Sequence, residues 1–450
     1  MKLAALTAIV VLAAIAVVLR RWRCPDEHCD WPTRLVAVAI GAIFLGYFAI
    51  VLQGAGPGRP SSDLGVYLRA AWAAKQGESL YAVADSRGWH YIYPPLLANL
   101  LIPLANPPEE APAGYRAAAV SYRLSASLWY WFCVACVLAA VHVMASGLER
   151  SQTGEGPSPL FSQGWWNLRL LPLLIALFFV LDDLRRGQPT AIILLCLAGS
   201  AVSIVRGGSL RAGAWLGLAT ALKLFPVYLL LYPIWRRDGR FFGAALAATL
   251  ACSLLPAAIM GPWAALAAYR EFISERLLGE ASGAGDPAVA HELHAISSSI
   301  QSFEFLFYDA LHPQRESRAS QLPEGYFLAH LATSLLITAA ALWAMRRRRG
   351  PLGEYLFFSS LALLAIPMLP VSRPHYFMLG LLVVAGLLAN GEKRGDRPWC
   401  RRTVAIAMAV FLAASVVDAA RIGWALDFGA ATLTGLALAA LALRRAKQEA

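Results

Sequence analysis

Ionisable side chains occur in a few short polar stretches of a chain that is otherwise strongly apolar. Asp63 lies in SSDLGVY, and Asp182 and Asp183 precede Arg185 and Arg186 in DDLRRGQP. A carboxylate can take a proton as a general base, and guanidinium groups can hold a phosphate by charge-assisted hydrogen bonds. For Asp63 the alternative is helix capping, because SSD opens a plausible amphipathic helix.

Lys223 has apolar neighbours on both sides in LATALKLFPVYLLL. An ammonium at membrane depth is tolerated only where it faces protein or a polar cavity. We therefore interpret Lys223 as a site residue, whereas Arg185 and Arg186 can be either site residues or solvated anchors.

The sequence lacks the common nucleotide and metal motifs, among them the Walker loop, the dinucleotide fingerprint, HExxH and Gly-x-Ser-x-Gly. Cys24, His28 and Cys29 could bind a metal, but an isolated cluster of this kind is more often a loop. His291 and His294 are interpreted as polar residues of a loop surface. We predict no resident metal and no cofactor.

The composition is that of an all-α, polytopic integral membrane protein. Of 450 residues, 58% are hydrophobic and only 15% are charged, and apolar runs recur along nearly the whole chain. The net charge of +11 comes largely from basic blocks between apolar runs, such as WRRDGR and MRRRRG. This positive-inside pattern indicates orientation in a membrane, with membrane lipids as partners, rather than nucleic-acid binding.

If every basic block is cytoplasmic, we expect about 11–13 membrane helices. We divide the chain into an N-terminal anchor helix (1–24), a membrane catalytic domain (25–390) and a C-terminal helix pair (391–450). The stretch 53–120 stays on the outer face, where YIYPPLLANLLIPLA forms juxtamembrane helices with Trp89, Tyr91 and Tyr93 as aromatic anchors. A second outer loop ends near residue 325.

One segment does not fit a simple span. RGGSLR and WRRDGR are both basic, yet only AGAWLGLATALKLFPVYLLLYPI separates them, so both ends must lie inside. Pro226 disfavours helix at Phe225 and removes a backbone donor. We predict a re-entrant hairpin with Lys223 near its apex.

This topology gathers polar side chains at the outer face, which suggests a site there. They are Asp63, Tyr67, Tyr93, Asp182, Asp183, Arg185, Arg186, Gln188, Gln301, Arg373 and His375, with Lys223 reaching toward them.

The motifs SSDLGVY, YIYPPLL, RRGQPTAIILL, the Lys223 hairpin, SSSIQSF and SRPHYF occur in an order that resembles glycosyltransferase family 87. The resemblance covers about residues 34–380. It implies the GT-C fold, and the family includes polyprenol-phosphate-mannose-dependent α-mannosyltransferases. Two features depart from the family pattern: SSSIQS stands where something closer to Asn-Gln-Ser is expected, and an extra helix precedes the family's first.

The resemblance implies a polyprenyl-phosphate sugar donor and inverting transfer of a hexose, with mannose favoured, to a lipid or glycan acceptor outside the plasma membrane. Asp63 is the implied catalytic base, and Lys223, Arg373 and His375 are candidates for the donor phosphate. The remaining substrate-binding candidates are Tyr67, Tyr93, Arg185, Arg186, Gln188 and Gln301.

Two alternatives remain open at this point. The first is a non-enzymatic transporter or lipid flippase that uses the same polar cluster, although no inverted repeat is visible. The second is an enzyme with a metal at Asp182 and Asp183, although the outer loop lacks a clear Asp-x-Asp.

Overall fold

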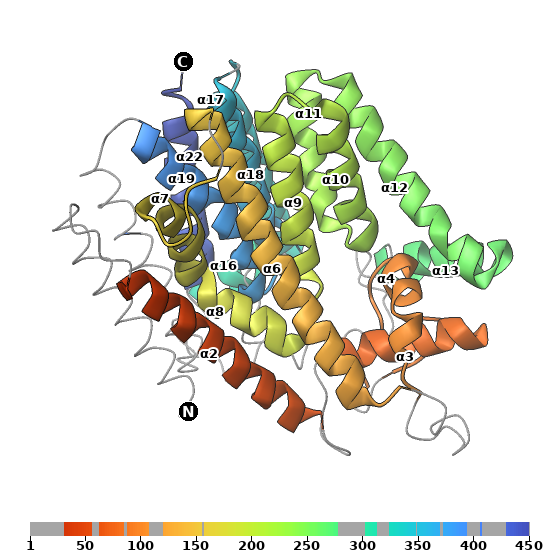
Figure 1. Ribbon diagram of the computed structural model, residues 1–450. Helices are drawn as coiled ribbons and strands as arrows, with labels where there is room; N and C mark the ends of the chain where they lie inside the picture. The colour runs from red at the N-terminus through yellow and green to blue at the C-terminus, as the bar shows by residue number, and fades with distance from the viewer. Residues whose placement is uncertain are drawn as a thin grey trace.

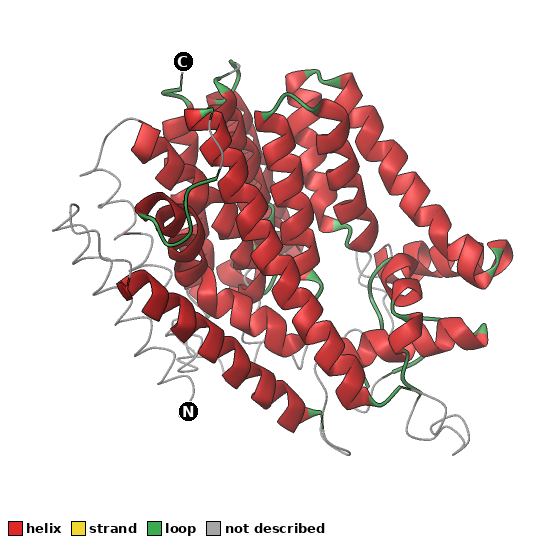
Figure 2. Ribbon diagram, in the orientation of Figure 1, coloured by secondary structure: helices red, strands yellow, loops and turns green. Residues whose placement is uncertain are grey.

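The computed structural model describes residues 31–55, 63–84, 88–107, 120–154, 157–277, 302–312, 324–347, 349–369, 372–393, 406 and 429–449. Within these ranges the protein consists of helices and connecting loops, with one isolated β-bridge between Ala84 and His90 (Figure 2). The all-α prediction is confirmed. The N-terminal helix expected in 1–24 and most of 391–428 lie outside the described residues, so the proposed domain limits stay a prediction.

The described chain forms a succession of α-helices joined by short 3₁₀ and π segments. Its first half contains α2 (Trp31–Gly54), α3 (Asp63–Gln76), α4 (Pro95–Leu100), η1 (Ile102–Leu104), α6 (Tyr122–Thr153), α7 (Gln163–Trp165), η2 (Trp166–Leu170), α8 (Leu171–Arg186), α9 (Thr190–Val205) and α10 (Ser209–Leu222). Its second half contains η3 (Phe225–Leu230), α11 (Leu231–Arg236), α12 (Gly239–Met260), α13 (Pro262–Glu271), η4 (Phe272–Leu277), α16 (Phe303–Leu311), α17 (Glu324–Ala344), α18 (Pro351–Leu364), η5 (Ile366–Met368), η6 (Pro374–Leu379), α19 (Gly380–Lys393) and α22 (Ala430–Ala446).

Six apolar segments in the described chain are long enough to cross a membrane, and they differ sharply in burial. The segment Pro374–Gly391 is 100% buried inside the protein, whereas those of α12 and α17 are 11% buried. Leu254 and Leu336, for example, are 68% and 70% exposed. Helices that are apolar on their outer side need a non-aqueous surrounding, so α12 and α17 face lipid and the protein is an integral membrane protein.

The predicted hairpin is present. α10 ends at Lys223, whose backbone is extended, and the chain returns through the 3₁₀-helix η3 and the short helix α11. The Ser209 hydroxyl donates to Asp238 Oδ2 at 2.7 Å, which joins the start of the hairpin to the residue just after it. Both basic ends therefore lie together, and Lys223 is at the opposite end of α10 (Figure 1).

Close packing against α12 fixes the direction of the hairpin. A β-carbon at Gly213 would collide with the backbone oxygen of Phe241, and one at Gly217 with that of Ala245. Small residues let the two helix backbones approach one another, as in other membrane helix pairs. The position of the hairpin apex thus depends on these two glycines.

The segment predicted to lie on the outer face contains the helices α3, α4 and η1, but the role predicted for its aromatic residues is wrong in part. Tyr91 and Tyr93 are 0% and 7% exposed and pack on one another, with ring centroids 6.0 Å apart. The Tyr91 hydroxyl donates to the Pro94 carbonyl at 2.7 Å. These two tyrosines therefore build the protein interior rather than anchor it in the lipid headgroups, and only Trp89 is half-buried.

The turn predicted at 182–189 is shorter than expected. Asp182 to Arg186 form the last turn of α8, and Gly187 ends the helix in the left-handed conformation with φ 70°. Glycine adopts this conformation without strain, which explains its place after the last helical residue. Only residues 187–189 connect α8 to α9, so the polar groups of this segment stand on a rigid helix end.

Candidate active site

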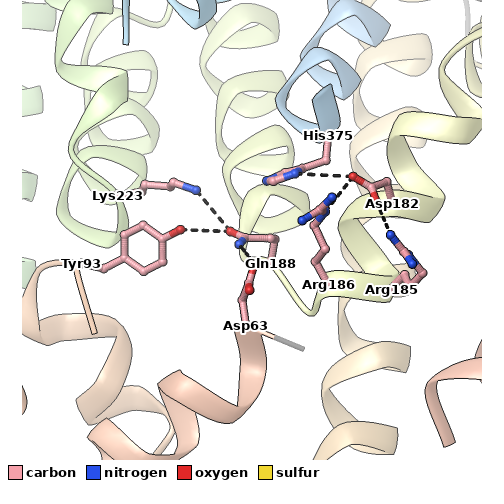
Figure 3. A network of polar contacts seen from close by, with 8 residues as sticks. All are labelled: Asp63, Tyr93, Asp182, Arg185, Arg186, Gln188, Lys223 and His375. Atoms are coloured by element: carbon pink, nitrogen blue, oxygen red, sulfur yellow. Dashed lines mark hydrogen bonds and ion pairs between the residues drawn. The ribbon is translucent and has the colours of Figure 1, made fainter. Parts of the chain in front are cut away.

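Four segments that are far apart in the sequence meet at one cluster of polar side chains (Figure 3). Asp63 is the first residue of α3, Gln188 follows the end of α8, and Lys223 lies at the hairpin apex. Tyr93 belongs to the turn before α4. The N-terminal position on α3 also suits a carboxylate electrostatically, so structural and chemical roles for Asp63 are compatible.

Gln188 links these residues. Its Nε2 donates to Asp63 Oδ2 at 2.5 Å, and its Oε1 accepts hydrogen bonds from the Tyr93 hydroxyl at 3.0 Å and from Lys223 Nζ at 3.4 Å. The Tyr67 hydroxyl donates to that of Tyr93 at 3.4 Å. Burial raises the pKa of Tyr93 to about 12, so this phenol stays protonated and can donate.

Lys223 is a buried cation in an aromatic slot. The residue is 5% exposed, and its Nζ lies 4.6 Å from the centroid of the Tyr93 ring and 4.2 Å from that of Tyr376. Among the described residues, no carboxylate comes within ion-pair distance of this ammonium. A buried ammonium without a carboxylate in direct contact is costly, so this position is suited to an anionic ligand.

Asp182 organises a second group next to the first. Its Oδ1 contacts Arg185 Nη2 at 3.2 Å, and its Oδ2 contacts Arg186 Nε at 2.8 Å and His375 Nδ1 at 3.7 Å. His375 is fully buried, whereas the side chain of Arg185 is 51% exposed. Both arginines of this group thus have a carboxylate in contact, whereas the Lys223 ammonium has none among the described residues.

The remaining predicted site residues are Asp183, Arg373 and Gln301, and Asp183 is fully buried in the last turn of α8. Arg373 directly precedes η6 and is 9% exposed, and its Cζ lies 5.8 Å from the centroid of the Trp89 ring. Within the described chain it has neither a hydrogen-bond partner nor an ion-pair partner. Gln301 lies outside the described residues.

The structure thus brings together Asp63, Tyr67, Tyr93, Gln188 and Lys223, and it places Arg185, Arg186 and His375 around Asp182. Sequence reasoning missed Tyr376, which forms one wall of the Lys223 slot. Its position within SRPHYF, beside two predicted residues, was the available signal.

Comparison with known proteins identifies the family. The model of glycosyltransferase family 87 matches residues 91–372, which is more than half of the chain. The chain belongs to glycosyltransferase family 87. It is therefore a membrane glycosyltransferase, which confirms the resemblance and the predicted enzyme class and leaves the transporter alternative without support.

A curated relative and a solved structure are also similar to this family 87 chain. The relative is the polyprenol-phosphate-mannose-dependent alpha-(1-2)-phosphatidylinositol mannoside mannosyltransferase of Mycobacterium tuberculosis, 27% identical over 86% of this chain and 82% of its own. ArnT from Cupriavidus metallidurans, solved with undecaprenyl phosphate and in the apo state, aligns with a TM-score of 0.40 and 14% identity. That alignment covers 92% of this chain and 77% of ArnT.

Proposed function

We propose that the protein transfers mannose from a polyprenyl-phosphate donor to a lipid or glycan acceptor at the outer face of the plasma membrane, with inversion at the anomeric carbon. The observation that carries the proposal is that one glutamine, Gln188, contacts both Asp63 and the buried ammonium of Lys223. The donor of the mycobacterial relative supports the choice of polyprenyl-phosphate mannose.

In this reaction the acceptor hydroxyl oxygen attacks the anomeric carbon, and the bond from that carbon to the donor phosphate breaks. The bonding electrons leave with the polyprenyl phosphate, and Asp63 takes the proton of the hydroxyl as general base. Because phosphate is already a good leaving group, the protein needs chiefly one base and cations to stabilise the departing charge.

Lys223 is the principal phosphate-binding residue in this proposal, because its ammonium lacks a carboxylate partner within the described site. Arg373 supplies the second cation. His375 is fully buried against Asp182, and we assign it to holding that cluster beside the donor. The exposed part of Arg185 can reach the headgroup region of a lipid substrate.

The first prediction tests the base. Asp63→Asn keeps the size of the side chain but removes its basicity, so transfer from polyprenyl-phosphate-mannose should fall by roughly 10²- to 10⁴-fold. The measurement is the formation of mannosylated lipid by the purified protein in nanodiscs, with a membrane lipid extract as acceptor. Assignment of the anomeric configuration of the product by NMR tests inversion.

Glu271→Gln is the matched control. Glu271 is the last residue of α13, and its carboxylate accepts hydrogen bonds from the Ser79 hydroxyl at 2.6 and 2.8 Å. The variant should transfer sugar at the wild-type rate. Turnover by Asp63→Asn close to that of wild type would contradict the assignment of the base, and a wild-type protein without transfer would contradict the donor.

A further inference from the structure

The side-chain amide of Gln188 is engaged mainly by protein groups. The residue is 4% exposed, and both ends of its amide are engaged by protein groups. The oxygen accepts from Tyr93 and Lys223, and the nitrogen donates to Asp63. Since a carbonyl oxygen has two acceptor sites, the protein already occupies both of them.

The orientation of this amide follows from its neighbours. An ammonium has only donors and an ionised carboxylate has only acceptors, so the oxygen must face Lys223 and the nitrogen must face Asp63. A neutral amide in this position satisfies both groups and neutralises neither. No other uncharged side chain of this length offers an acceptor at one edge and a donor at the other.

Hydrogen bonds hold the backbone around Gln188 in place. Gly187 accepts a hydrogen bond from Trp129 Nε1 at 2.8 Å, and the Gln188 amide nitrogen donates to the Asp183 carbonyl at 3.1 Å. Cys133 Sγ lies 3.8 Å from the backbone carbonyl oxygen of Gln188. The side chain is therefore carried by a fixed turn and not by a loop that follows the substrate.

We propose that Gln188 is a positioning residue that acts as a spacer between the base and the phosphate-binding cation. Without it, Asp63 and Lys223 could form a direct ion pair, in which the carboxylate loses basicity and the ammonium loses its affinity for phosphate. Gln188 holds the two charges on opposite edges of one amide. The proposal rests on the function proposed above and adds to it a reason why the two groups stay separate.

The test is a double-mutant cycle on donor binding. Gln188→Met keeps the length of the side chain but removes both hydrogen-bonding edges, so Lys223 can approach Asp63. The dissociation constant for polyprenyl-phosphate-mannose should rise about tenfold, a coupling of the size found between contacting residues. In an Asp63→Asn background the carboxylate is gone, and the same substitution should then change donor affinity less than about twofold.

A residue that binds the donor directly gives the opposite result, since it weakens binding equally in both backgrounds. Equal losses would therefore overturn the spacer role. Gln152→Met is the matched control, because Gln152 is a partly buried glutamine whose Nε2 donates to the Ala389 carbonyl at 2.6 Å, far from the site in sequence. It should leave donor affinity unchanged.

A second measurement needs no substrate and separates failure of this proposal from failure of the proposed function. Gln188→Glu places a second carboxylate against Asp63. The contact with Asp63, at 2.5 Å, is shorter than that with Lys223, at 3.4 Å, so repulsion should outweigh the new attraction and the melting temperature should fall. When Gln188→Glu is combined with Asp63→Asn, the new amide at position 63 can donate to the carboxylate at position 188, and the melting temperature should recover. Absence of recovery would overturn the proposed contact, whether or not the wild type binds this donor.

Discussion

Lys223 carries the buried charge on which donor binding depends in the proposed mechanism. Lys223→Met should preserve expression and thermal stability, because methionine is unbranched and fits the slot between Tyr93 and Tyr376. The dissociation constant for polyprenyl-phosphate-mannose should rise by about 10- to 100-fold, the value of a hydrogen bond to a charged group. Binding can be measured in nanodiscs with labelled donor.

Lys223→Arg is the companion variant and should be only partly active, because a planar guanidinium does not replace a compact ammonium between two rings. If Lys223→Met binds and transfers like wild type, the lysine is structural. The phosphate would then have to be held by Arg373, the other cation without an acidic partner in the described site.

The contacts of Asp182 favour a metal-independent mechanism over a metal-assisted one. Each of its carboxylate oxygens contacts an arginine, at 3.2 and 2.8 Å, so a cation at this carboxylate would have to displace two guanidinium groups. The described residues also contain no group of three or more His, Cys, Asp or Glu side chains suited to a metal. We therefore expect EDTA to leave the transfer rate unchanged. A loss of activity that Mg²⁺ or Mn²⁺ restores would support the metal alternative.

At the scale of elements, the contact between α10 and α12 places Lys223 in the site. Gly217→Ala should lower the free energy of unfolding by about 1–3 kcal/mol, because the added methyl group meets the Ala245 backbone oxygen and the hairpin must shift. Donor affinity should fall with it, since the hairpin carries Lys223. Thermal unfolding and donor binding report the two effects.

Gly243→Ala is the control for this prediction. Gly243 is in the interior of α12, and a β-carbon there meets no atom within 4 Å. Alanine is the better helix former by about 1 kcal/mol, so this variant should be as stable as wild type or more so. Equal stability of the two variants would show that α10 and α12 can separate without cost.

The hairpin could be predicted from sequence because two signals agree there. Charge fixes both of its ends on one side, and Pro226 supplies the break. The burial of Tyr91 and Tyr93 could not be predicted, since aromatic residues near a membrane surface are equally typical of anchors and of packed interiors. Their role depends on contacts with Tyr67 and Tyr81, which no local sequence pattern reveals.

The residues of the candidate site could be predicted from their types, but the contacts between them could not. Asp63, Gln188 and Lys223 each stand out in an apolar chain, and the topology places them on one face. That a single amide joins them depends on distances between helices that no local pattern encodes. It is likewise visible only in three dimensions that both arginines pair with Asp182, whereas Lys223 has no carboxylate in contact within the described chain.

At the scale of the whole molecule, α11 and α3 lie toward opposite ends of the bundle (Figure 1), and the basic residue Arg236 ends the first while Asp63 begins the second. Arg236 Nη1 donates to the Met345 carbonyl at 2.7 Å and Arg236 Nε contacts Glu354 at 2.7 Å, which joins the hairpin end to the loop between α17 and α18. α10 spans about 21 Å with its 14 residues, so Lys223 lies that far from the basic end. The positive-inside rule then predicts that the basic end is cytoplasmic and that the site lies outside.

This orientation can be tested with single cysteines at exposed positions of the two ends. Gln76→Cys, at the end of α3, should react with a membrane-impermeant maleimide in intact cells, whereas Arg346→Cys, after α17, should react only after permeabilisation. The background is a variant in which Cys24, Cys29 and Cys400 are serine, and it reports labelling of the remaining cysteines. A polyprenyl-phosphate donor presents its sugar on one side of the membrane, so the labelled side also fixes where transfer takes place. Labelling of Arg346→Cys in intact cells, with Gln76→Cys protected, would reverse the topology and move the proposed reaction to the cytoplasmic face.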